Sequence, residues 1–305
     1  MNILFVSDRE RFWANFYGAM RFLIDRGHTV ESAMVPGKKW AQIDLAMEEM
    51  TRRGLDAAHV WSPVPPTISL LNWYAGLLWM RRWDAVVVCP EHLTPMRWTK
   101  WLLSQPAAPG IEESPTPVIA MQHGLAQKPY QKQPVYCDQF LAWSEIQRDV
   151  MLGGHVHVTV TGTSRFERFR PEDATDEGHI LAIAPSPTDE WGHGPGGEWL
   201  ERVKAMATGR MVIVKVHPND LTFTPPPDTP ELAWLPADQP PHEAMRTAHA
   251  VYMEYPSSCL LEAKAYGKKL ILTDWPQQFV DALEPGDAAP RLADAIESLA
   301  RKDAS

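Results

Sequence analysis

The sequence predicts an α/β protein with two domains, each built around a parallel β-sheet. Short apolar runs recur along the whole chain, and stretches with the apolar spacing of helices separate them. This alternation is typical of βαβ units, in which successive strands pair in parallel. Polar, turn-prone residues at 166–178 interrupt it. We therefore expect one domain over residues 1–168 and a second over residues 169–305.

In the first domain, apolar and β-branched runs predict the strands, and amphipathic stretches predict the helices. The run at 85–89, Ala-Val-Val-Val-Cys, is the clearest strand, because β-branched residues favour extended backbone. The first helix is expected to end near Gly27, since glycine is common just after helices. Strands are expected at 2–7, 29–34, 85–89, 118–121, 139–143 and 156–160, and helices at 12–26, 40–53 and from 144.

The second domain repeats the scheme with shorter elements. Proline clusters at 225–227 and 236–241 predict a surface loop. Strands are expected at 180–184, 211–216, 250–254 and 270–273, and helices at 198–207, 241–247, 258–266 and 291–302.

Composition and charge argue against several classes of protein. Hydrophobic residues make up 45% of the chain and charged residues 22%, which is ordinary for a globular protein. The net charge of −9 argues against general electrostatic binding to nucleic acid. No apolar run reaches the roughly 18 residues of a membrane-spanning helix, and the first residues do not resemble a signal peptide. Cys89, Cys137 and Cys259 lack metal-ligand spacing, so we expect a cytoplasmic protein with reduced cysteines.

Three polar motifs follow predicted strands or open a predicted helix. They are Met121-Gln122-His123-Gly124, Val216-His217-Pro218-Asn219-Asp220, and Ser257-Ser258 followed by Glu262. In open α/β sheets, ligands bind beyond the carboxyl ends of the strands, which is where these residues are expected. Two hydroxyl groups at the start of a helix suit a phosphate, because free N–H groups and the helix dipole point towards it.

These motifs, together with Thr161-Gly162-Thr163-Ser164-Arg165, resemble those of the nucleotide-sugar-dependent glycosyltransferases of the GT-B fold. Within that fold the chain looks most similar to the capsule and teichoic-acid group, which includes polysialyltransferases, Kdo transferases and CDP-glycerol glycerophosphotransferases. The resemblance implies two Rossmann-like domains that face each other across a cleft, with a last helix that can cross back to the first domain. It implies an enzyme that moves a sugar, or a related group, from a nucleotide-activated donor to an acceptor hydroxyl, without a metal or another cofactor.

The resemblance places donor binding in the second domain. It implies that His217 donates to a phosphate or ribose, that Ser257 and Ser258 bind the donor phosphates, and that Glu262 holds the ribose hydroxyls. Lys215 is expected on the same side of its strand as His217. Arg165 is a candidate for neutralising the phosphates. Each has a plainer interpretation: Ser257 as an ordinary N-cap, Glu262 as a solvated carboxylate, and Arg165 as a structural residue of an interdomain turn.

The acceptor side is expected in the first domain. Gly124 lets the backbone approach a ligand closely, and His123 is a candidate general base because a neutral imidazole accepts a proton near pH 7. Asp8 and Glu91 also follow predicted strands and are the alternative bases. The sequence does not rank these three.

Other functions stay open at this point. Arg97-Trp98-Thr99-Lys100-Trp101 interleaves cations with indoles, which suits a glycan acceptor or the nucleic acid of a DNA-base-modifying glycosyltransferase. A nucleotide-sugar epimerase or hydrolase would use the same donor site, and a non-catalytic binding module would retain only the fold. His155 and His157 alternate on a strand without a third ligand, so no metal site is expected. The partners are then a nucleotide-sugar donor and an acceptor that is a glycan, a lipid-linked molecule or a nucleic acid.

Overall fold

The computed structural model describes residues 1–7, 15–34, 60–61, 78, 83–89, 99, 103, 116–122, 137–151, 157–185, 195, 197–218, 220, 223–254, 257–272 and 287–302. The chain divides into two compact units. Unit 1 comprises Met1–Arg165 and Gly286–Ser305, and unit 2 comprises Phe166–Pro285. The last residues of the chain therefore belong to the unit that contains the first.

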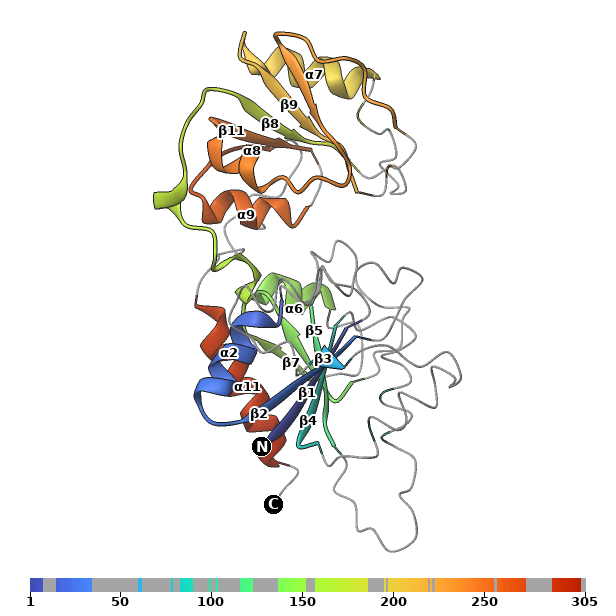
Figure 1. The fold of residues 1–305 in the computed structure, drawn as a ribbon, viewed down its shortest axis with the longest axis vertical. Helices are drawn as coiled ribbons and strands as arrows, with labels where there is room; N and C mark the ends of the chain where they lie inside the picture. The colour runs from blue at the N-terminus through green and yellow to red at the C-terminus, as the bar shows by residue number, and fades with distance from the viewer. Residues whose placement is uncertain are drawn as a thin grey trace, which may run out of the picture. The chain divides into compact units, whose positions relative to one another are not determined.

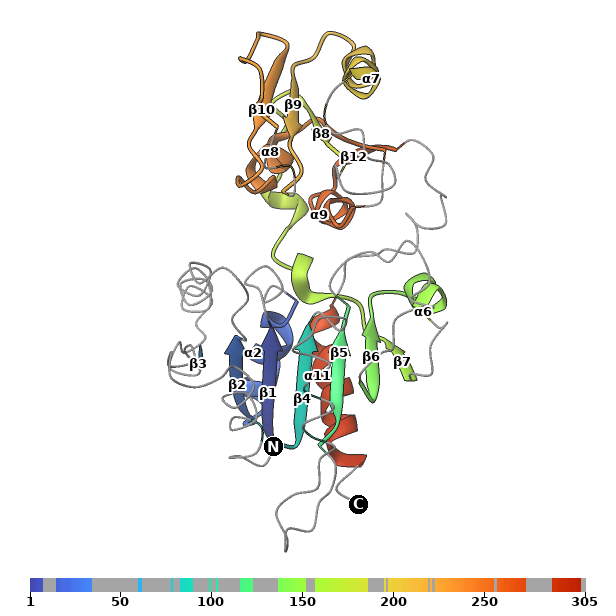
Figure 2. The ribbon, with the colours of Figure 1, turned by 90° about the vertical axis from the view of Figure 1, so that its right-hand side faces the viewer.

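Among its described residues, unit 1 contains a seven-stranded parallel sheet (Figure 2). Its strands are β1 (Asn2–Ser7), β2 (Thr29–Met34), β3 (Val60–Trp61), β4 (Ala85–Cys89), β5 (Val118–Met121), β6 (Gln139–Ala142) and β7 (His157–Val160), in the order β3-β2-β1-β4-β5-β6-β7. Every residue of β4, β5 and β6 is buried. Such continuously apolar strands are typical of the centre of a parallel sheet that is covered on both faces.

Two helices from distant parts of the chain, α2 (Tyr17–Asp25) and α11 (Ala288–Lys302), cover one face of this sheet (Figure 1). Leu292 and Ile296 of α11 join Phe5 and other strand residues in one buried cluster. A Cβ atom at Gly18 would lie 2.6 Å from Cβ of Ser164 and 2.8 Å from Cβ of Ala289. The close approach of α2 to α11 therefore requires glycine at this position.

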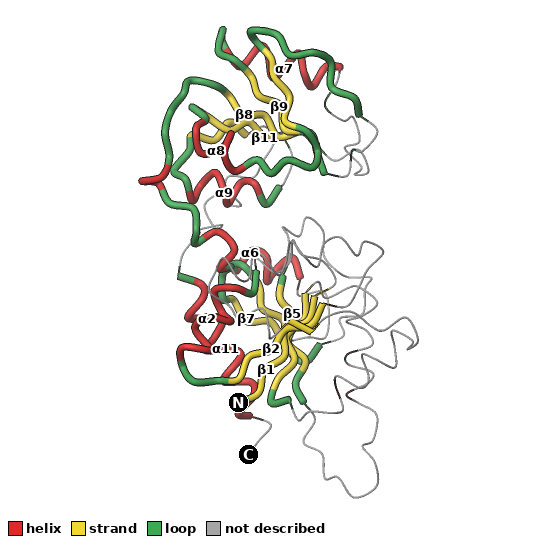
Figure 3. The backbone as a smooth tube through the Cα atoms, in the orientation of Figure 1, coloured by secondary structure: helices red, strands yellow, loops and turns green. Residues whose placement is uncertain are grey.

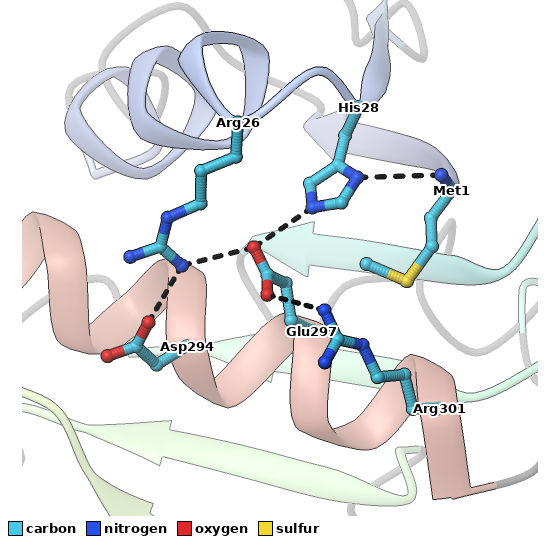
Figure 4. A network of polar contacts seen from close by, with 6 residues as sticks. All are labelled: Met1, Arg26, His28, Asp294, Glu297 and Arg301. Atoms are coloured by element: carbon cyan, nitrogen blue, oxygen red, sulfur yellow. Dashed lines mark hydrogen bonds and ion pairs between the residues drawn. The ribbon is translucent and has the colours of Figure 1, made fainter.

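A polar network also fastens α11 to α2 (Figure 4). Glu297 accepts hydrogen bonds from Nε2 of His28 at 2.9 Å and from Nη1 of Arg26 at 3.0 Å, and Arg26 also donates to Asp294 at 2.7 Å. Burial alone would raise the pKa of Glu297, but the hydrogen bonds from His28 and Arg26 hold it below its ordinary value. Charged and apolar contacts thus both join the end of the chain to unit 1.

The described part of unit 2 contains a five-stranded parallel sheet, coloured yellow in Figure 3. Its strands are β8 (Ile180–Ile183), β9 (Val212–Lys215), β10 (Leu232–Leu235), β11 (Ala250–Met253) and β12 (Lys269–Leu272), in the order β10-β9-β8-β11-β12. Helix α7 (Gly197–Ala207) covers one face, and α8 (His242–Thr247) and α9 (Cys259–Ala265) cover the other (Figure 1). Gly267, at a φ of 66°, ends α9 in the left-handed conformation that favours glycine.

Strand β10 is absent from the sequence-based prediction. Its four residues, Leu-Ala-Trp-Leu, lie between proline-rich stretches that indicate a loop. It is an edge strand, where nearby prolines interrupt no central ladder. The expected helix at 40–53 lies outside the described residues.

The two sheets confirm the predicted α/β fold class, and they share one strand order. If the strands of each unit are numbered along the chain, both sheets contain the arrangement 3-2-1-4-5. This is the order of the Rossmann fold, in which the connections leave the first strand on one side and return on the other. No helix in the described part of the chain is long and apolar enough to cross a membrane.

Candidate functional site

The strand order of unit 2 marks where a ligand is expected. The chain runs from β8 to β9 and β10 on one side and then returns to β11 and β12 on the other. At such a switch point ligands bind beyond the carboxyl ends of the strands. The candidate site is therefore the carboxyl edge of this sheet, where His217 follows β9, Glu254 follows β11, and Ser257 precedes α9.

Lys215 ends β9 with a buried side chain. Its Nζ donates to the carbonyl oxygens of Val216 at 2.6 Å, Pro236 at 2.8 Å and Ala237 at 3.0 Å. Burial lowers the pKa of Lys215 to about 8, although the nearby Cys259 favours the charged form. An ammonium group has three N–H donors, and these carbonyls take all three. Lys215 thus joins the carboxyl ends of β9 and β10 and has no donor left for a phosphate.

The His217 and Ser257-Ser258 motifs lie at the same edge of this sheet. His217 follows β9 and Ser257 follows β11, and β8 lies between these two strands. Oγ of Ser257 accepts the N–H of Cys259 at 3.3 Å, whereas the Ser258 side chain makes no capping hydrogen bond within the described chain. His217 is partly exposed, and its carbonyl accepts the N–H of Asp220 at 2.9 Å, which closes a tight turn. The structure therefore places both predicted motifs at the carboxyl edge of one sheet.

On the face of the sheet that α7 covers, an ion pair fixes the end of β11. Arg202 of α7 donates from Nε and Nη2 to the two carboxylate oxygens of Glu254, each at 2.9 Å. The buried Tyr252 donates its hydroxyl to the same carboxylate. The hydrogen bonds from Arg202 to Glu254 raise the pKa of the guanidinium. Because Arg202 neutralises Glu254, this carboxylate does not present an unbalanced negative charge at the switch point.

Glu262 lies in a cluster between α8 and α9. Its side chain is only 3% exposed, and Oε2 lies 3.3 Å from Nδ1 of His242, the first residue of α8. Nη2 of Arg168 lies 3.2 Å from Nε2 of His242, and the guanidinium lies over the ring of Phe169. The Phe169 ring packs against His242 and Tyr266 at centroid distances of 4.9 and 5.0 Å. Glu262 is thus a buried partner of a histidine, and not the solvated carboxylate of the plainer interpretation.

Arg165 and the residues before it lie in unit 1, where Thr161 and Gly162 contact α11. Nε of Arg291 donates to the carbonyl of Thr161 at 3.0 Å. A Cβ atom at Gly162, which has a φ of 81°, would lie 3.0 Å from Cβ of Ala288 and from Nη2 of Arg291. The backbone N–H of Arg165 donates to Oγ1 of Thr163 at 3.3 Å. These contacts give the motif a structural role in docking α11.

The predicted acceptor residues lie outside the described residues. They are Asp8, Glu91, His123, Gly124 and, apart from Thr99, the stretch Arg97–Trp101.

Gln122, the residue before His123, is described and buried. Its side chain accepts the N–H of Trp143 at 2.8 Å and donates to Gln147 at 2.5 Å, and its carbonyl accepts Nε1–H of Trp143 at 3.0 Å. The carboxyl end of β5 is therefore held to the residues that follow β6.

Sequence reasoning did not single out Arg168, Arg202 and His242. Glu254 carried a usable signal, since it is a charged residue at the end of an apolar strand. Arg168, Arg202 and His242 are ordinary surface residues by sequence, and only the packing of helices on the sheet brings them to their partners.

A scan against models of protein families finds no match, and a search of curated proteins finds none either. Solved structures do match. A UDP-GlcNAc 2-epimerase from Neisseria meningitidis, bound to UDP-GlcNAc, aligns with a TM-score of 0.59 at 14% identity over 100% of this chain and 94% of that one. A UDP-N-acetylglucosamine 2-epimerase from Rickettsia bellii aligns with a TM-score of 0.58 at 11% identity, over 99% and 94% of the two chains.

A third similar structure, the glycotransferase of kitacinnamycin, aligns with a TM-score of 0.53 at 12% identity, over 99% of this chain and 91% of that one. At such identities the likeness shows the fold alone. It agrees with the two parallel sheets and with their common strand order. The chain therefore has the GT-B fold, with two Rossmann-like domains, that glycosyltransferases and UDP-GlcNAc 2-epimerases share.

Proposed function

We propose that this chain is a glycosyltransferase that moves a sugar from a nucleotide-activated donor to an acceptor hydroxyl. The donor's nucleotide binds at the carboxyl edge of the unit 2 sheet, next to His217, Ser257 and Ser258. The observation that carries the proposal is that both motifs follow strands at the carboxyl edge of a Rossmann-type sheet, on the two sides of its switch point.

The charges at this edge favour binding through hydroxyl and imidazole groups. Lys215 is occupied by carbonyls, and Arg202 is paired with Glu254. Helix α9 has 7 residues, so its dipole is small, and side chains must supply most of the hydrogen bonds to a phosphate. The serine hydroxyls and the His217 imidazole are the groups at this edge that suit that task.

Replacing both serines tests this placement. Ser257→Ala with Ser258→Ala should weaken nucleotide binding about tenfold or more, because each charge-assisted hydrogen bond contributes roughly 1.5–3 kcal/mol. Ser298→Ala, which removes an exposed hydroxyl of α11, is the matched control and should leave affinity unchanged. Titration calorimetry on the three proteins decides, and equal affinity in all of them would place the nucleotide elsewhere.

On the acceptor side, His123 is the general base of the proposal, with Asp8 and Glu91 as the alternatives. Support comes from Gln122, which holds the strand end from which His123 follows. His123→Ala should lower turnover by about 10²–10⁴-fold while donor binding stays near wild type. Unchanged turnover would move the role to Asp8 or Glu91, and lost donor binding would make His123 a donor ligand.

The proposal includes no resident metal or other cofactor. Its prediction is that chelation with EDTA leaves turnover unchanged. Loss of turnover that added Mg²⁺ or Mn²⁺ restores would contradict this part of the proposal.

The second candidate is epimerisation of a nucleotide sugar. The observation in its favour is that the solved structures that share this fold include two UDP-GlcNAc 2-epimerases, with TM-scores of 0.59 and 0.58. The site described in unit 2 serves either reaction, because both begin with a bound nucleotide sugar.

Incubation in D₂O separates the two reactions. Inverting a C–H stereocentre breaks that C–H bond, so an epimerase given UDP-GlcNAc would place deuterium on the sugar and keep the UDP attached in the product. A transferase leaves the sugar's C–H bonds intact and releases nucleotide only when an acceptor takes the sugar. Mass spectrometry of a panel of UDP-, CMP-, CDP-, GDP- and TDP-activated donors, with glycan acceptors, therefore identifies the reaction class and the donor together.

A further inference from the structure

The cluster of Arg168, His242 and Glu262 lies within unit 2, at the start of α8 and beside α9. Because α8 runs from the end of β10 to the start of β11, its first residue, His242, lies at the same edge of the sheet as His217 and Ser257. Arg168 comes from the segment that enters unit 2. The cluster therefore adjoins the proposed nucleotide site.

The contact with Arg168 identifies which ring nitrogen of His242 is the acceptor. A guanidinium can only donate, so the contact of Arg168 with Nε2, at 3.2 Å, requires Nε2 to accept. In a neutral imidazole the proton is then on Nδ1, which faces Oε2 of Glu262 at 3.3 Å. Nδ1 and Oε2 make no hydrogen bond, but the negative charge of the buried carboxylate beside Nδ1 favours the tautomer whose acceptor nitrogen points away from it.

The exposed fractions of the His242 and Glu262 side chains indicate different roles. The Glu262 side chain is 3% exposed, whereas that of His242 is 28% exposed, and Arg168 is exposed. A ligand at this edge therefore meets the imidazole before the carboxylate. Nε2 of His242 is the acceptor that it can reach by displacing one hydrogen bond to an exposed arginine, which contributes little to stability.

We propose that His242 contacts the nucleoside of the donor, with Nε2 accepting a hydrogen bond from a ribose hydroxyl or from a base N–H, and that the neighbouring Glu262 carboxylate favours the tautomer in which Nε2 accepts. The inference rests on the proposed nucleotide site and names a residue of that site. Arg168 occupies Nε2 until the nucleoside replaces it.

Two charged groups contact the imidazole, Arg168 from the entering segment and Glu262 from α9. Glu243 and Arg246 of α8 lie close to Tyr266, together with Arg168 and Glu262. Glu243 and Arg246 are paired with each other at 2.9 Å.

The test compares UDP with 2′-deoxy-UDP and with N3-methyl-UDP, each of which removes one hydrogen-bond donor of the nucleoside. Wild type should bind one of the two analogues about 3- to 10-fold more weakly than UDP. His242→Asn retains an N–H near the Nδ1 position but lacks the Nε2 acceptor, so it should bind UDP and that analogue equally. His242→Gln places an amide oxygen near Nε2 and should restore part of the preference.

The control is His249→Asn, the same substitution at a histidine of unit 2 that pairs with Asp176. It should keep the wild-type preference.

The outcomes distinguish this inference from the proposed function. If UDP binds and the two serine replacements weaken it, but His242→Asn keeps the wild-type preference, the role of His242 is wrong and the nucleotide site stands. If neither UDP nor any nucleotide of the donor panel binds, the nucleotide site is wrong and the inference fails with it.

Discussion

The two sheets have the same strand order, but they differ in which parts of the chain supply the helices that cover them. In unit 1, α11 comes from the end of the chain to cover the sheet beside α2, with an apolar face and an ionic network. In unit 2, the described covering helices, α7, α8 and α9, arise from the connections between its own strands. Its polar side chains gather at the carboxyl edge. There Lys215 donates to backbone carbonyls and Glu254 is paired with Arg202, whereas the Ser258 side chain makes no capping hydrogen bond at α9 within the described chain.

This difference indicates that α11 serves the stability of unit 1, whereas the sheet edge of unit 2 serves ligand binding. Unit 1 depends on residues far away in the sequence to complete its core, so its stability responds to changes in α11. Unit 2 is continuous in sequence and holds its strand ends with contacts between its own segments. A sheet edge whose backbone is fixed in advance can bind a ligand with little ordering cost.

The largest expected effect comes from removing an apolar anchor of α11. Leu292→Ala should lower the free energy of unfolding of unit 1 by about 2–5 kcal/mol, because it empties a buried site. Hydrogen exchange should show faster opening in β1 and β4 and no change in β8 or β11. Leu260→Ala, at a buried site of α9, is the matched change and should give the reverse pattern. Uniform loss of protection in both units would contradict the expectation that each unit opens without the other.

Lys215 should give unit 2 a distinctive pH dependence. Burial lowers its pKa from 10.5 to about 8, so between these values the unfolded chain holds a proton that the folded chain has released. The free energy of unfolding of unit 2 should therefore rise with pH across this window, by up to about 3 kcal/mol at 1.36 kcal/mol per pKa unit. Urea denaturation from pH 7.5 to 10 should show this rise in wild type and not in Lys215→Met. The same slope in both proteins would disprove the assignment.

Gly18 tests the close contact between α2 and α11. Gly18→Val should destabilise unit 1 by about 1–3 kcal/mol, because its Cβ would overlap Ser164 and Ala289. Gly18→Ala should do the same to a smaller extent. Thermal unfolding monitored by exchange in each unit measures both variants, and a neutral Gly18→Val would mean that α11 lies farther from α2.

The smallest expected effect is electrostatic. The pKa of Glu297 lies below its ordinary value, so its ionised form stabilises unit 1 above the unfolded pKa of about 4.3, and this contribution is lost as the pH falls through the folded value. Glu297→Gln should cost about 1 kcal/mol at pH 7 and nothing near pH 2. Glu201→Gln, at an exposed ion pair of α7, is the control and should be nearly neutral at both. An equal loss at pH 7 and pH 2 would contradict the ionic origin.

The fold could be predicted because its signals are local. Continuous apolar runs such as Val86–Val88 and glycines after helices such as Gly27 report strands and helix ends from neighbouring residues alone. The missed strand β10 shows the limit, since four residues between prolines carry too weak a pattern.

The candidate site could be predicted only in part. His217, Ser257 and Ser258 were identifiable because polar residues that interrupt apolar runs are a local signal. The occupation of Lys215 by three carbonyls and the burial of Glu262 against His242 depend on contacts between distant segments. A sequence pattern names candidate residues, but only packing decides which of them has a group available for a ligand.

The central claim is that, of two sheets with one strand order, the second binds the nucleotide at its carboxyl edge. Hydrogen exchange with and without a saturating nucleotide, chosen by thermal shift from UDP, CMP, CDP, GDP and TDP, tests it directly. We predict slower exchange at residues 212–218 and 257–265 and unchanged exchange at residues 118–122 and 139–148. Protection of the unit 1 segments, with no change at the two unit 2 segments, would contradict the account.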